Sequence, residues 1–367
     1  MKWKRSVGLL VLAVWIGLLT ACSSSGGSLL PPNHYGEEAG VQQMRALLYP
    51  FVTEDLSGKY GVYTNYIESD QNAPMATGHE VLSESAGLLL RFYALTGQED
   101  RYREEWERTK AVFGREKMFS YRYSPKLDKQ YEVNAAVDDL RIIRSLYEAG
   151  EKFDDRSYTS LAKLYGGKFS EIVIQNDKLY DFYDDRLLKT NDAITLCYID
   201  LKTLQLFLPK KQEKELIPGL LSIISGGYLS DSFPFYAASY NYSTGTYNKD
   251  RINTLESVLT ILALTEINAQ KPESISFLKK HVKEGTLYGR YTPDGVPDTD
   301  IRSTAIYAAA AMIGSQLGDE ELYKDSMLRV KEFQIRDENN PLNGGFGDAA
   351  GQAYSFDNLM ALLAAAY

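Results

Sequence analysis

The pattern of apolar and polar residues along the chain predicts helices nearly throughout. Apolar residues recur with the 3.6-residue period of a helix in segment after segment. Strict alternation over more than four residues is rare, and the short stretches that show it fall between the helical segments. The pattern therefore predicts helices at roughly 36–51, 78–96, 99–114, 133–149, 157–174, 191–208, 211–225, 251–268, 272–284, 300–316, 319–334 and 353–367.

Every second predicted helix is the more apolar, whereas the helices between them are amphipathic with one charged face. This alternation indicates an internal repeat of six helical hairpins, each with one buried and one surface helix. We therefore predict an all-α fold, an (α/α)6 barrel with short β-hairpins in its loops, that occupies residues 36–367. The inner helices of such a barrel are parallel, so their N-termini meet at one end.

The N-terminal residues have the features of an export signal. A basic start and an apolar run precede Leu19-Thr20-Ala21-Cys22, which resembles the lipobox of bacterial lipoproteins. We expect residues 1–21 to be a signal peptide, Cys22 to be acylated, and residues 22–35 to hold a flexible tether. The protein would then lie outside the cytoplasm, lipid-anchored to the bacterial cell membrane. The alternative is an ordinary cleaved signal followed by a chance cysteine.

Charge and composition narrow the possible partners. The formal net charge is −9, and removal of Lys2, Lys4 and Arg5 with the signal peptide makes it −12 (−9 − 3). Such a surface repels nucleic acid. The three histidines lie far apart without metal-ligand spacing, so we expect no metal site and no cofactor.

Acidic residues occur where the predicted inner helices begin. The segment 81–95 is apolar on nearly every side, and yet Glu84 lies within it, about a helical turn after Glu80. Helix capping alone could explain any single acid. It explains less well the doubled acids and Glu84, which we expect to lie a turn or more inside its helix. The acids concerned are Glu80, Glu84, Asp138, Asp139, Asp192, Asp250, Asp298, Asp300 and Asp357.

Aromatic residues accompany these acids. The predicted loop 231–250 is rich in tyrosine, and it contains Tyr236 and Tyr240. A tyrosine ring offers a flat apolar face and a polar edge, which suits contact with sugar rings. Carboxylates that line an aromatic cleft are what glycosidic bond cleavage requires, since one acid protonates the leaving oxygen and one base activates water. The sequence thus predicts a polysaccharide substrate.

Several segments resemble the family 8 glycoside hydrolases. The segment VLSESAGLLLRFYALTGQEDRY resembles the family segment V-S-E-G-x-x-Y-G-M, whose glutamate is the general acid and here falls on Glu84. AAVDDLRIIRSL resembles A-T-D-A-D-x-x-I-A, which implies a sugar-holding role for Asp139 beside Asp138. KDRINTLESVLTIL is similar to the D-A-I-R segment of the catalytic base, which implies Asp250. Asp192, in TNDAIT, is the alternative base.

This resemblance spans about residues 36–367 and implies an inverting, endo-acting hydrolase of a β-1,4-linked polysaccharide. It is closest to a divergent branch of lipoproteins encoded with exopolysaccharide synthesis genes in Bacillus and Listeria relatives. Ser85-Ala86-Gly87 depart from the family pattern after the acid. Two alternatives therefore stay open, a non-catalytic glycan-binding lipoprotein on the same fold and a polysaccharide lyase.

Overall fold

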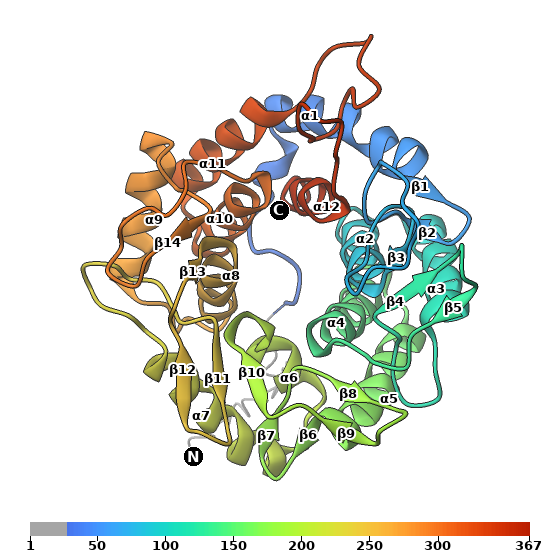
Figure 1. The fold of residues 1–367 in the computed structure, drawn as a ribbon, viewed down its shortest axis with the longest axis vertical. Coiled ribbons are helices and arrows are strands. Elements are labelled where there is room, and N and C mark those ends of the chain that lie inside the picture. Colours follow the sequence, from blue (N-terminus) through green and yellow to red (C-terminus); the bar gives the residue numbers. More distant parts are fainter. Residues whose placement is uncertain (1–27) are drawn as a thin grey trace, which may run out of the picture.

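Two concentric rings of helices form the molecule, as the computed structural model of residues 28–367 shows (Figure 1). The inner ring comprises α2 (Ser83–Leu95), α4 (Ala136–Lys152), α6 (Leu201–Phe207), α8 (Thr254–Thr265), α10 (Thr304–Leu317) and α12 (Ser355–Ala364). The outer ring comprises α1 (Ala39–Pro50), α3 (Glu99–Phe113), α5 (Arg156–Val173), α7 (Lys210–Gly226), α9 (Pro272–Glu284) and α11 (Glu320–Phe333). The predicted (α/α)6 barrel is confirmed. The predicted signal peptide and Cys22 lie outside the described residues.

The inner ring closes because each inner helix packs against its neighbours and α12 returns to α2. Inner helices are covered on both sides, which explains why helices such as α8 and α10 have nearly uniform apolar sequences. In α10, all side chains from Thr304 to Ser315 are buried, and a run of four alanines lets adjacent helices approach closely. Within residues 28–367, the longest apolar helices all fall short of what a membrane crossing requires.

The two ends of the barrel differ in their connections. Short turns such as 96–98 and 318–319 lead from an inner helix to the next outer helix. Long loops lead back from each outer helix to the N-terminus of the next inner helix. We call the end with the long loops and inner N-termini the mouth, and the end with the short turns the closed end.

Small antiparallel sheets form in the loops, as predicted. The strands are β1 (Ser57–Gly58), β2 (Gly61–Val62), β3 (Val81–Leu82), β4 (Arg122–Ser124), β5 (Lys129–Gln130), β6 (Ile174–Gln175), β7 (Lys178–Leu179), β8 (Tyr183–Asp184), β9 (Lys189–Thr190), β10 (Ala193–Thr195), β11 (Ser239–Asn241), β12 (Thr246–Asn248), β13 (Ile252–Asn253) and β14 (Arg290–Tyr291). Short helical turns occupy Tyr35–Glu37 (η1), Phe51–Asp55 (η2, a π-helical turn) and Leu196–Tyr198 (η3).

These strands explain where the predicted helix bounds were wrong. The helices predicted from residues 78 and 191 begin only at Ser83 and Leu201. The residues before these starts form β3 and β10 instead, which pair with β4 and β11. Glu84 is therefore in the first turn of α2 rather than a turn or more inside it. In this first turn the free N–H groups and the helix dipole favour a negative charge.

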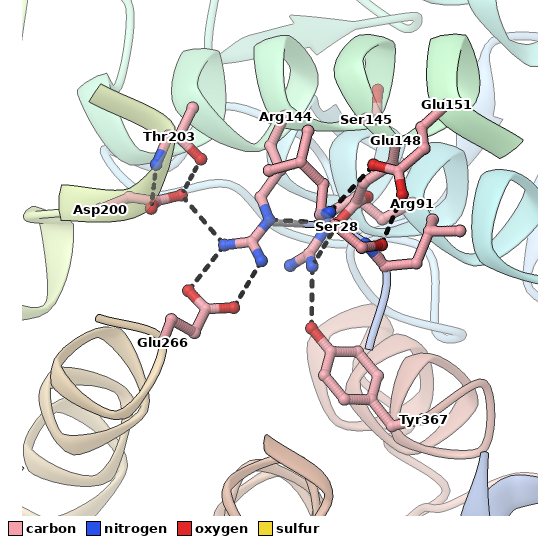
Figure 2. Close-up of polar contacts among 12 residues, drawn as sticks. Ser28, Arg91, Arg144, Ser145, Glu148, Glu151, Asp200, Thr203, Glu266 and Tyr367 are labelled. Atoms are coloured by element: carbon pink, nitrogen blue, oxygen red, sulfur yellow. Dashed lines mark hydrogen bonds and ion pairs between the residues drawn. The ribbon is translucent and has the colours of Figure 1, made fainter. Parts of the chain in front are cut away.

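A buried ionic network joins the inner helices toward the closed end (Figure 2). Glu148 of α4 is fully buried and accepts hydrogen bonds from Arg91 of α2 and from Arg144 of its own helix. Arg144 also pairs with Glu266, directly after α8, and Arg91 donates to the hydroxyl of Tyr367 at 2.9 Å. Because every charge has a partner, the network is tolerated in the interior and fixes the helices relative to one another.

Candidate active site

Two carboxylates and one guanidinium lie together at the mouth. Arg141 Nη1 donates to Asp138 Oδ1 at 2.9 Å and to Glu84 Oε2 at 3.4 Å. The other oxygen of Asp138 accepts from the Ser83 hydroxyl at 3.1 Å. The side chain of Glu84 stays 26% exposed, whereas that of Asp138 is 7% exposed. Glu84 is thus the member of this group that a bound molecule can reach.

The surroundings of Glu84 favour its protonated form. Its pKa is raised to about 7, first by burial and second by the negative charge of Asp138, against a lowering effect of Arg141. Burial likewise raises the pKa of Asp138, although Arg141 and Ser83 lower it. Desolvation therefore outweighs the nearby cation, and Glu84 keeps a proton up to neutral pH.

Asp139 points away from Glu84 and into the wall of the mouth. Its Oδ2 accepts from Asn134 Nδ2 at 2.8 Å, and its Oδ1 accepts from the Phe119 backbone N–H at 3.4 Å. Asn134 in turn accepts from the Tyr183 backbone N–H at 2.6 Å. Burial, with a further contribution from Asp138, raises the pKa of Asp139 to about 8. Asp139 is 2% exposed, so it positions Asn134 and the loop around it.

An aromatic pocket of about 500 Å³ opens beside this wall. Four aromatic side chains and two carboxylates contribute to it, and Asn134 links it to Asp139. A pocket of this kind presents ring faces with a few polar groups, as sugar-binding sites do. The lining residues are Tyr121, Tyr131, Val133, Asn134, Ala135, Asp181, Phe182, Asp184 and Tyr198.

A smaller pocket of about 250 Å³ lies where α10 and α12 begin. Thr304, Tyr354 and Asp357 line it, together with Phe333 and Phe346. In the inner ring, α10 and α12 are separated from α4 and α6 by α2 on one side and α8 on the other (Figure 1). The mouth therefore has pockets on two sides, with Glu84 of α2 between them.

Asp181 and Glu256 are half-buried carboxyls that the sequence analysis did not select. Asp181 lines the aromatic pocket and accepts from the Thr195 backbone N–H at 2.6 Å and from Asn191 at 3.0 Å. Burial raises the pKa of Asp181 despite these bonds. Burial and the charge of Asp181 both raise the pKa of Glu256. The two carboxyls therefore lie close enough to interact.

The sheet β10–β11–β12 separates Asp192 from Asp250, and both acids are exposed. Asp192 precedes β10 at the edge where Ala193 pairs with Asn241. Asp250 follows β12 at the opposite edge, where Thr195 and Asn248 both pair with Ser239. The chain enters η3 directly after Thr195 and then continues into α6 of the inner ring. The end of the sheet that contains Thr195 and Asn248, and with it Asp250, is therefore the end nearer the inner ring.

The two tyrosines selected from loop 231–250 have different surroundings. Tyr236 is 3% exposed and packs against Tyr228, with ring centroids 5.4 Å apart, so it offers no face to a ligand. Tyr240 in β11 is half-buried, and its ring centroid lies 4.8 Å from that of Tyr247 in the neighbouring strand β12.

Glu80 is not a partner of Glu84 in a helix. It precedes α2, and it is fully buried against Arg122, which donates to both of its oxygens at 2.8 and 2.7 Å. Arg122 also donates to the backbone carbonyls of Ala73 and Pro74. This ion pair fixes the loop before α2, and Glu80 takes no part in the site. Asp357 is also structural, since it accepts from Ser303 and from the Ala305 N–H at the start of α10.

Some of the missed residues left a signal in the sequence. Arg141 is three positions after Asp138, a spacing at which side chains on a helix meet. Arg122 and Asp181 are distant in sequence from the groups they contact, so no local spacing could indicate them.

Known proteins resemble this chain in sequence and in overall fold. No family model matches the sequence. A Bacillus subtilis (strain 168) protein named "Putative lipoprotein YdaJ" is 24% identical over 98% of this chain and 96% of its own length. The structure of a protein described as a novel α-amylase from Clostridium perfringens is 30% identical, with a TM-score of 0.81, over 90% of this chain and 99% of that chain.

More distant structures share the fold. PssZ from Listeria monocytogenes has a TM-score of 0.68 and 20% identity over 86% of this chain and 93% of its own. A cold-adapted family 8 xylanase has a TM-score of 0.63 and 9% identity over 90% and 91% of the two chains. The chain belongs to the same family of glycoside hydrolases as the Clostridium perfringens protein, and it shares the (α/α)6 barrel fold of the family 8 xylanase.

The buried carboxyl of Asp139 predicts a pH-dependent stability. A carboxyl whose pKa rises to about 8 on folding binds its proton more tightly in the folded state. Its contribution to the unfolding free energy therefore falls as the pH rises from about 4 to about 8. The unfolding free energy of Asp139→Asn, relative to that of the wild type, should increase by more than about 2 kcal/mol from pH 5 to pH 8, since each pKa unit is worth about 1.4 kcal/mol.

Urea unfolding at the two pH values measures this difference. Asp154→Asn, in the exposed turn after α4, is the matched control and should follow the wild type at both values. Parallel pH dependence of wild type and Asp139→Asn would contradict the prediction.

Proposed function

We propose that the protein is an extracytoplasmic, lipid-anchored glycoside hydrolase that cleaves a polysaccharide, with Glu84 as its general acid. The observation that carries the proposal is the partly exposed carboxyl of Glu84 beside Asp138 at the mouth of a glycoside hydrolase barrel, where burial raises its pKa to about 7. A general acid must reach the substrate and still hold its proton near neutral pH. Glu84 meets both conditions.

Asp138 and Arg141 control the proton of Glu84 in this proposal. When Glu84 gives its proton to the leaving oxygen, it becomes an anion beside Asp138, and Arg141 Nη1 already contacts both carboxyls. Arg141 can therefore stabilise the charge that develops during bond cleavage. Asp139, which the sequence assigned to the sugar, acts through Asn134 instead. Asp138 is also buried, and it acts through Arg141 and Glu84 rather than by direct contact with the sugar.

Asp250 remains the proposed base, because it lies at the end of the sheet nearer the inner ring and is exposed to water. Asp192 is less suited, since it lies at the other edge. The structure adds Glu256 and Asp181 as competing candidates, because both are half-buried and Asp181 lines the aromatic pocket. An ionised base that activates water on the far face of the sugar gives single inversion.

Pockets on two sides of Glu84 favour internal cleavage of a polymer, because a chain can extend in both directions from the scissile bond. The proposed linkage is β-1,4, as the sequence resemblance implies. The relative described as an α-amylase favours an α-glucan as a second candidate substrate. The substrate panel should therefore contain β-glucans, chitosan, N-acetylhexosamine polymers, bacterial exopolysaccharide and starch.

Substitution of Glu84 tests the catalytic proposal. Glu84→Gln keeps the shape of the side chain but removes its proton, so we expect release of reducing ends to fall at least about 10³-fold while oligosaccharides still bind. Asp250→Asn should lower the rate of hydrolysis to a similar extent, whereas Asp192→Asn should keep most of the wild-type rate.

The controls separate the remaining functions. A larger loss in Glu256→Gln or Asp181→Asn than in Asp250→Asn would move the base to that residue. Wild-type rates in Glu84→Gln would refute its role. Binding without release of reducing ends in the wild type would favour the glycan-binding alternative, and products that absorb in the ultraviolet would indicate a lyase. Proton NMR of the first-formed anomer tests inversion.

The pH profile tests how Glu84 holds its proton. Activity of the wild type should decline as the pH rises through about 7, because the acid form of Glu84 is lost. Asp138→Asn should move this decline to lower pH, since it removes a negative charge, and Arg141→Gln should move it to higher pH, since it removes a positive charge. Shifts in the same direction in both variants would contradict the assignment of the decline to Glu84.

We also propose that Cys22 carries the lipid anchor. The lipobox-like sequence motivates this, and the similar Bacillus protein is named as a lipoprotein. Cys22→Ser should release the protein from membranes into the medium or the soluble fraction, measured after a salt wash. Retention of the variant on washed membranes would mean that something else holds the protein there.

A further inference from the structure

The first described residues cross the closed end of the barrel. We call Ser28–Glu38 the strap; it is the blue segment visible through the central opening (Figure 1). The Ser28 hydroxyl and the Leu29 N–H both donate to Glu151, near the end of α4, and the second of these bonds is 2.9 Å long. Farther along, Asn33 donates to the Ser315 carbonyl, near the end of α10, at 2.7 Å.

The strap is held at several points along its length, so the flexible tether predicted for residues 22–35 does not include residues 28–35. The Tyr35 N–H donates to the Tyr367 carbonyl at 2.9 Å, and Pro31 is buried. Gly36 approaches the chain after α12 so closely that a Cβ at this position would lie 2.2 Å from the Ala365 carbonyl oxygen. Ser28 itself lies beside the ionic network near Glu148 (Figure 2). These contacts fix the point at which the chain leaves the described structure.

Chain length then limits where Cys22 can lie. Six residue steps separate Cys22 from Ser28 and span at most about 22 Å when fully extended. With 17 residues, α4 gives a barrel height of about 25 Å. A path from Ser28 to the mouth around the outside must also pass two helix layers of about 10 Å each, for a total of about 45 Å. Cys22 therefore cannot reach the mouth side.

We infer that the closed end faces the lipid surface and that the mouth is held away from it, at least about 25 Å from the bilayer. This inference rests on the proposed Cys22 anchor and deepens the proposed function. Its consequence concerns the substrate. Glycosidic bonds in a polymer that extends away from the membrane are within reach, whereas those of a short sugar attached to a lipid in the same bilayer are not.

Energy transfer from the protein to the bilayer measures the orientation without requiring activity. Full-length lipidated protein with Cys197→Ala is labelled at a single introduced cysteine and bound to vesicles of phosphatidylcholine and phosphatidylglycerol that contain a rhodamine-labelled lipid. Glu99→Cys at the start of α3 and Ala269→Cys in the turn between α8 and α9 place the donor at exposed closed-end positions on different sides of the ring. Thr244→Cys and Ala349→Cys place it in exposed mouth loops.

We expect stronger energy transfer from both closed-end positions than from both mouth positions. The mean heights of the two pairs of labels above the bilayer should differ by about 25 Å. Two positions at each end cancel the effect of a tilt. Equal or reversed transfer, or a failure of the lipidated protein to stay on the vesicles, would overturn the inference.

A longer tether supplies the matched control. A Gly/Ser insertion of about 24 residues after Ser25 adds a mean reach of about 25–30 Å, so the difference between the two ends should shrink markedly. An unchanged difference would mean that a surface of the barrel, and not the short connection, sets the orientation.

Activity assays keep this inference distinct from the proposed function. The anchored enzyme should cleave soluble polymer at least 10-fold faster than a short lipid-linked oligosaccharide of the same sugar in its own bilayer, while the released Cys22→Ser protein should cleave both. If neither protein cleaves anything, the proposed function fails while the transfer result stands. Equal cleavage of both substrates by the anchored enzyme would overturn the orientation.

Discussion

The parallel direction of the six inner helices is the constraint on which the rest of the structure depends. Since each hairpin repeats the same order of inner and outer helix, all inner N-termini meet at the mouth. There the free N–H groups and helix dipoles favour negative charge, which lets Glu84 and Asp138 occupy first turns of apolar helices. The long loops end at the same place and supply the aromatic side chains. One topological rule therefore assembles acids and rings at one end.

The closed end holds this arrangement in register. Glu148 and its two arginines tie α2 and α4 together, and Glu266 and Tyr367 extend the ties to α8 and to the chain after α12. Removal of one partner from such a network leaves an uncompensated buried charge, so the helices cannot shift relative to one another at low cost. Rigid inner helices in turn fix the distance between Glu84 and the acids of the facing loops. The strap crosses the same end, where it contacts the ends of α4 and α10.

The acids at the mouth look alike in sequence but differ in their surroundings. Glu80 is neutralised by Arg122, Asp357 caps α10, and Asp139 supports Asn134. Glu84 differs from all of these, because it is partly exposed, its pKa is raised and Arg141 contacts it. Burial and partners, rather than residue type, divide structural carboxyls from the proposed catalytic one.

The sequence by itself determined the helical hairpins, their number and the barrel, and it selected Glu84 on an inner helix, because amphipathic periodicity is a local property of the chain. It placed Glu84 too deep in that helix. It placed the starts of α2 and α6 too early, because β3 and β10 depend on pairing with distant strands. Only the tertiary structure decided that Asp138 rather than Asp139 faces Glu84, that Tyr236 is buried, and that Arg122, Asp181 and Glu256 matter. Those outcomes depend on contacts between residues far apart in the chain. Desolvation and charge pairing between such residues produce no local pattern in the sequence.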